Sequence, residues 1–138
     1  MRKDLVKKFQ EKGFVTVPDV FSLSEMEFYR EVIKDAIKER KQYDLRSLED
    51  KSEYEQSFIQ CQNMWEDYPV IRELTFDQRL GEIASNLLGV NKLRVWHDQA
   101  LVKEAGGRET DPHHDQPYWP IKETNTITAW IPFCNISR

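Results

Sequence analysis

The main hydrophobic period of the sequence changes near Gly89, and this change limits the fold more than any other feature. Before that glycine, the longest patterned stretches have apolar residues at three- and four-residue steps, which is the period of an amphipathic helix. After it, residues 93–103 and 126–131 alternate between apolar and polar side chains, as strands do. Helices followed by strands predict an α+β fold with an antiparallel sheet, rather than a parallel α/β sheet.

The segment before residue 20 predicts one helix and one strand. Leu5, Val6 and Phe9 form a short apolar stripe, and Gly13 can end this helix in a left-handed conformation. Residues 14–17 are β-branched or aromatic and are followed by proline, which predicts a strand.

Two residue pairs have the spacing of a capping box, which marks the start of a helix. Ser22 and Glu25 predict a long helix with one buried stripe. Thr75 and Gln78 predict another helix, whose strong apolar stripe ends at Gly89.

The region between these two helices has no clear period. Residues 40–55 are highly charged, which predicts a surface loop or a frayed helix end. Residues 58–70 are rich in aromatic side chains, and such a stretch covers a core more often than it lines a pocket.

The composition indicates a soluble globular protein, because 39% of the residues are hydrophobic and 32% are charged. A formal charge of -4 provides no overall field that would attract nucleic acid or an anionic membrane. Cys61 and Cys134 show no disulfide or metal-binding spacing. No apolar signal or membrane segment is evident, so a cytoplasmic location is expected.

The residues best suited to bind a metal lie in the run PHHDQPYWP, residues 112–120. Side chains two apart on an extended segment point the same way, so His113 and Asp115 can converge on one ion while His114 points to the opposite side. Their mixed nitrogen and oxygen donors suit Fe(II), and a second histidine would complete a facial triad with open positions. The tripeptide alone favours an ordinary surface loop, because this spacing also arises by chance.

The setting of the tripeptide resembles the phytanoyl-CoA dioxygenase family of Fe(II)- and 2-oxoglutarate-dependent oxygenases. The resemblance lies in the order of three runs, WHDQALVKEAGG, PHHDQPYWP and TITAWIPF. The opening GFVTVPDVFS and the helix that ends in Leu-Leu-Gly are also similar to the family. The likeness covers nearly the whole chain and is most specific between Trp96 and Pro132.

The resemblance implies a double-stranded β-helix, a cupin-like relative of the jelly roll, with helices flanking it. It also implies Fe(II) held by His113 and Asp115, and 2-oxoglutarate in a pocket lined by Gln99, Thr128 and Trp130. Gln99 can offer an amide donor, Thr128 a hydroxyl group and Trp130 a wall that excludes water. The implied reaction hydroxylates a small organic substrate and releases succinate and carbon dioxide.

Two features of the family's pattern are missing after Asp115. No histidine follows it as a third iron ligand, and no arginine stands where the family binds the far carboxylate of 2-oxoglutarate. Residues 1–138 are therefore expected to form one domain, the truncated N-terminal portion of an oxygenase, with 1–90 mainly helical and 91–138 carrying the first core strands. An open half-barrel exposes strand edges, so self-association is also expected.

Two other interpretations stay open. The chain could be a truncated module that binds a ligand or partner without catalysis. Zinc held by His97, His113 and Asp115 would have the three protein ligands of a catalytic site. His97 fits better as a pocket histidine, because it precedes the motif, whereas the second histidine of the family that the chain resembles follows it. The substrate itself cannot be read from the sequence, since specificity lies in loops rather than in the fold.

Overall fold

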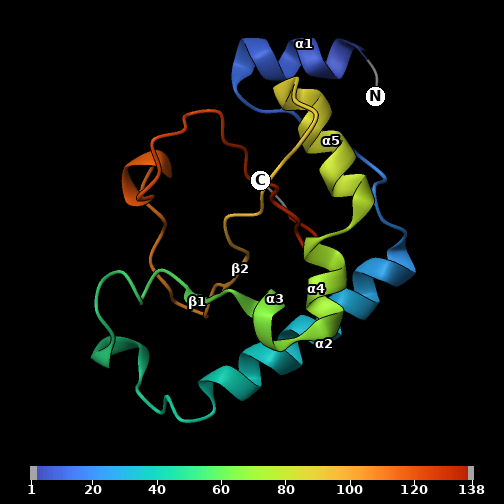
Figure 1. Ribbon diagram of the computed structural model, residues 1–138. Helices are drawn as coiled ribbons and strands as arrows, with labels where there is room; N and C mark the ends of the chain where they lie inside the picture. Colours follow the sequence, from blue (N-terminus) through green and yellow to red (C-terminus); the bar gives the residue numbers. More distant parts are fainter. Residues whose placement is uncertain (1–2, 137–138) are drawn as a thin grey trace.

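A computed structural model describes residues 3–136 as a group of helices beside a short antiparallel sheet (Figure 1). In chain order, the elements are α1 (Lys3–Lys12), α2 (Leu23–Lys41), η1 (Leu48–Asp50), β1 (Ile59–Gln62), α3 (Met64–Asp67), α4 (Pro69–Thr75), α5 (Gln78–Leu88), β2 (Gln99–Val102) and η2 (Gln116–Tyr118). None of the helices in this described range is long and apolar enough to cross a membrane.

The local helix signals near the N-terminus are confirmed. Gly13 ends α1 with φ of 76°, and its N–H donates to the carbonyl of Phe9 at 2.8 Å. Ser22 caps α2, where its Oγ accepts from the backbone N–H of Glu25 and its own N–H donates to the Glu25 carboxylate. In each of these signals the hydrogen-bonding groups are at most four residues apart, so the local sequence is enough to predict them.

The predicted start of α5 at Thr75 is wrong by two residues. Asp77 is the N-cap, and its carboxylate accepts from the N–H of Arg79 at 2.8 Å. Thr75 instead closes α4, and its hydroxyl donates to Asp98, 23 residues away. The predicted end of α5 is confirmed, because Gly89 is its left-handed C-cap with φ of 67°.

The strand predictions are only partly met. Residues 14–17 form no strand, the alternating run 93–103 narrows to β2, and residues 126–131 belong to no strand. Conversely, β1 lies in the aromatic segment, where no strand was expected. A strand is defined by its hydrogen-bonded partner, so alternation alone does not fix its limits. The mixture of helices and antiparallel strands is confirmed, but these two strands alone do not make a double-stranded β-helix.

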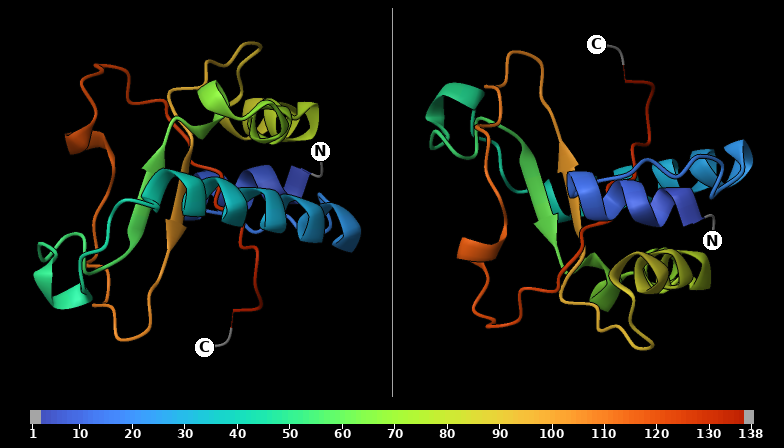
Figure 2. Two further views of the ribbon diagram at one scale, coloured as in Figure 1. Left: turned by 90° about the horizontal axis from the view of Figure 1, so that it is seen from below. Right: turned by 90° about the horizontal axis from the view of Figure 1, so that it is seen from above.

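The core lies where α2 and α4 pack on the sheet. β1 and β2 pair so that Cys61 is opposite Ala100. Buried Cys61 joins Ala36 and Ile37 of α2, together with Met64 and Ile71, in one hydrophobic cluster. The helices thus cover one side of the sheet, and the long loop after β2 extends from the other side (Figure 2).

Candidate metal centre

His113 and Asp115 lie on the long loop that follows β2, directly before the short helix η2, which is orange in Figure 1. His113 Nε2 is 3.6 Å from Asp115 Oδ1, and both side chains are partly exposed, at 45% and 39%. The side chains of His113 and Asp115 therefore point towards each other, as their spacing predicted. An ion could reach this pair from solvent.

The backbone of Asp111 orients the imidazole ring of His113. Nδ1 lies 2.7 Å from the carbonyl oxygen of Asp111. A carbonyl only accepts hydrogen bonds, so the proton belongs on Nδ1 and the neutral ring keeps its lone pair on Nε2. The lone pair is thus on the nitrogen that faces the Asp115 carboxylate.

The spacing of the pair fits two ligands of one divalent cation. A metal of this kind lies about 2.1 Å from an imidazole nitrogen or carboxylate oxygen, so two of its ligands can be up to about 4.2 Å apart. The observed 3.6 Å is within that limit and is too long for a direct hydrogen bond. A neutral imidazole and a carboxylate are also the donors that suit Fe(II).

A third ligand is not present in this arrangement. Between residues 3 and 136, no group of three His, Cys, Asp or Glu side chains could hold a metal. The zinc interpretation, which needs His97 beside His113 and Asp115, is therefore wrong for this conformation. His97 instead contacts Trp119 edge to face, with ring centroids 6.1 Å apart.

Thr128 contacts Asp115 directly. Its hydroxyl donates to Asp115 Oδ2 at 3.3 Å, while Oδ1 is the oxygen that faces His113. The extended segment around Thr128 therefore returns to the loop that carries the candidate ligands. The sequence predicted a cosubstrate-pocket role for Thr128 and gave no sign of this contact.

Gln99 and Trp130 are not brought into contact with the His113–Asp115 pair. Gln99 is exposed on β2, and its side-chain oxygen accepts a hydrogen bond from Gln60 Nε2 at 2.6 Å. Trp130 is 72% exposed and lines neither the hollow beside α5 nor the one at its C-terminal end. Their predicted role in binding 2-oxoglutarate remains a prediction.

Asp98 is a structurally important residue that the sequence reasoning missed. Its carboxylate accepts the N–H groups of Met64 and Trp65 at the start of α3, as well as the Thr75 hydroxyl. It therefore joins β2 to α3 and to the end of α4. Alternation along an extended segment places Asp98 on the opposite side from His97 and Gln99, and this was the one available signal that it faces inward.

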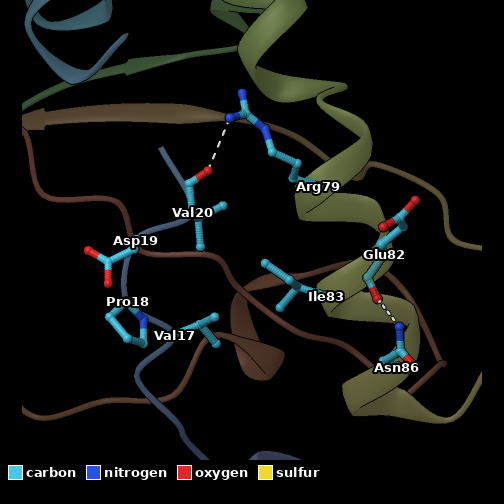
Figure 3. A pocket seen from close by; sticks show the side chains of 8 residues that line it. All are labelled: Val17, Pro18, Asp19, Val20, Arg79, Glu82, Ile83 and Asn86. Carbon is cyan, nitrogen blue, oxygen red and sulfur yellow. Dashed lines mark hydrogen bonds between the residues drawn. The ribbon is translucent and has the colours of Figure 1, made fainter. Parts of the chain in front are cut away.

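A separate hollow of about 350 Å³ lies between α5 and the loop at residues 17–20 (Figure 3). None of the predicted site residues lines it. Its one arginine, Arg79, is engaged by Glu25, Asp77 and the carbonyl of Val20. This arginine and the Ser22 groups lower the pKa of Glu25 to about 2. The guanidinium of Arg79 therefore stabilises the fold and is not available to a ligand.

Comparison with known proteins gives one match. A family model described as phytanoyl-CoA dioxygenase (PhyH) matches residues 9–138. No curated protein and no solved structure matches the chain.

Proposed function

Because this chain belongs to the phytanoyl-CoA dioxygenase family, we propose that it is an Fe(II)- and 2-oxoglutarate-dependent dioxygenase that hydroxylates a small organic substrate. Members of the family typically use this cofactor and cosubstrate. The observation that carries the proposal is the approach of His113 Nε2 to Asp115 Oδ1, with the lone pair of the imidazole on the facing nitrogen.

In this proposal, His113 and Asp115 hold the iron, which activates dioxygen when the cosubstrate is also bound. The Asp111 carbonyl fixes the ring of His113, and the Thr128 hydroxyl holds the outer oxygen of Asp115. Gln99 supplies an amide donor to 2-oxoglutarate, and Trp130 covers the site. One further protein ligand is required for a facial triad.

We also propose that residues 1–138 form one domain built on a cupin-like double-stranded β-helix. In this arrangement, β1 and β2 are two of its strands. The match over residues 9–138 supports this proposal, because it begins within α1 and spans all the later helices and both strands.

Anaerobic titration with Fe(II), with and without 2-oxoglutarate, tests the function. We expect a visible absorption band that requires both components, and we expect Asp115→Ala to abolish it. His114→Ala is the matched control, since this neighbouring imidazole is not part of the pair. Loss of the band in both variants, or its survival in Asp115→Ala, would show that the ligand assignment is wrong.

Residues 3–136 hold no third ligand beside the pair, which supports a second candidate function, a module of the same fold that binds a ligand or partner without catalysis. The same titration separates the two functions. A module with only half of the site would bind Fe(II) weakly and would give no band that depends on 2-oxoglutarate.

A further inference from the structure

Two hydrogen bonds connect Tyr54, Gln60 and Gln99 across the sheet. The Tyr54 hydroxyl donates to Gln60 Oε1 at 3.0 Å, and Gln60 Nε2 donates to Gln99 Oε1 at 2.6 Å. Within residues 3–136, no hydrogen-bond partner is found for Gln99 Nε2. The amide of Gln99 is therefore held by its oxygen, and its two N–H groups are unused.

The sheet register explains why these side chains meet. Gln60 pairs with Leu101 and Gln62 pairs with Gln99, so Gln60 and Gln99 are diagonal neighbours on one face. Diagonal positions are about 7–8 Å apart, which two glutamine side chains can span. Tyr54 reaches the same face from the loop before β1.

This face of β2 is connected to the loop that carries the candidate metal centre. His97 lies two residues before Gln99, on the same side of an extended segment. Its ring contacts Trp119, only four residues after Asp115. The side chain of Gln99 thus lies on the same side of β2 as His97, which contacts the loop that carries His113 and Asp115.

We infer that Tyr54 and Gln60 are positioning residues that fix the amide of Gln99 with its N–H groups available to an anionic or carbonyl oxygen of a ligand. This inference rests on the proposed function, in which that oxygen belongs to 2-oxoglutarate. The Tyr54 hydroxyl donates to the amide oxygen of Gln60, so the Gln60 amide nitrogen is turned towards Gln99. That nitrogen can only donate, so the amide oxygen of Gln99 is turned towards Gln60 and its nitrogen away from it.

Gln60→Glu tests this orientation, because a carboxylate can only accept. If Gln60 normally donates to Gln99, the amide of Gln99 must rotate in this variant so that its nitrogen donates to the introduced carboxylate. The oxygen of Gln99 then faces the ligand in place of the nitrogen. If the bonds run in the opposite sense, Gln99 already donates to Gln60 and its amide does not turn.

The first measurement is hydrogen exchange at the side-chain amide of Gln99, followed by NMR in the full chain. We expect exchange to be fast in the unaltered protein and at least several-fold slower in Gln60→Glu. Unchanged exchange would overturn the inference. This result does not depend on whether the protein binds 2-oxoglutarate.

The second measurement is the affinity for 2-oxoglutarate, read from the absorption band with Fe(II). We expect a loss of about tenfold in Gln60→Glu and a smaller loss in Tyr54→Phe, because a hydrogen bond to a charged group is replaced by a repulsive contact.

Two variants are the matched controls. Gln62→Glu places the same charge on the same face without the bond to Gln99, and Tyr43→Phe removes an exposed hydroxyl elsewhere. Equal losses in Gln60→Glu and Gln62→Glu would mean that charge alone acts, which would overturn the positioning role. Absence of the band in the unaltered protein would instead count against the proposed function.

Discussion

At the scale of single residues, the candidate metal centre depends on backbone and hydroxyl groups as much as on its two ligands. The Asp111 carbonyl sets the tautomer of His113, and Thr128 holds the outer oxygen of Asp115. Such outer contacts hold a ligand in the orientation that the metal needs, and removing one weakens metal binding even though the ligands remain. Thr128 thus supports Asp115 in the structure, and its predicted role in the 2-oxoglutarate pocket remains a prediction.

Thr128→Val tests this support. The change keeps the shape of the side chain and removes the hydroxyl donor, so we expect the affinity for Co(II), a stable substitute for Fe(II), to fall by about tenfold. Isothermal titration measures it. Thr126→Val, the same change two residues earlier, should bind Co(II) like the unaltered protein. Equal affinities in all three proteins would contradict the assigned contact.

At the scale of elements, two carboxylates join segments that are far apart in the sequence. Asp98 joins β2 to α3 and α4, and Glu25 joins the start of α2 to Arg79 on α5. Each carboxylate also satisfies backbone N–H groups at a helix start, where intrahelical partners are lacking. The Asp98 link holds the start of β2 against α3 and α4, and so helps to position the loop that begins after β2.

Asp98→Ala should lower the free energy of unfolding by about 1–3 kcal/mol, because three donors lose their acceptor. Asp98→Asn should lose less, since its amide oxygen can still accept. Urea denaturation measures both changes. Glu66→Ala, in the exposed first turn of α3, is the control, and a loss of similar size there would show that Asp98 has no special role.

Glu25 should respond to pH through Arg79. The folded-state pKa of Glu25, about 2, is below the ordinary value of 4.5, chiefly because Arg79 donates to the carboxylate. A lowered pKa favours the folded state above pH 4.5, and that contribution is lost as pH falls from 4.5 towards 2. We expect Arg79→Met to return the pKa towards 4.5 in an NMR titration and to flatten stability over this range. Arg30→Met, at an exposed ion pair, should leave the pKa of Glu25 unchanged.

At the scale of the whole molecule, the two-stranded sheet has open edges within the described chain. Each of its strands has a single strand partner among residues 3–136, so each presents an outer edge. Leu101 and Val102 on β2 are 45% and 37% exposed. Open edges with apolar side chains favour pairing with another chain.

We therefore expect association that increases with protein concentration, measured by light scattering. Leu101→Lys should reduce it, because a charge at an edge opposes strand pairing. Leu23→Lys changes a more exposed leucine on α2 and should not reduce association. A protein that stays monomeric at all concentrations would contradict the open-edge interpretation.

The sequence by itself determined those features whose partners are within about four residues. They include the end of α1 at Gly13, the Ser22 capping box, the end of α5 at Gly89 and the convergence of His113 with Asp115. Helical turns and extended segments have fixed geometry, so spacing alone places these groups. The motif order also determined the family.

The tertiary structure decided the contacts between distant segments. Only it showed that β1 pairs with β2, that Gln60 donates a hydrogen bond to Gln99 from 39 residues away, and that Thr128 contacts Asp115. It also showed that the N-cap of α5 is Asp77 rather than Thr75, because the Thr75 hydroxyl donates to Asp98. A strand or a polar side chain accepts many partners of equal chemistry, and which partner it meets depends on how the whole chain packs rather than on its neighbours.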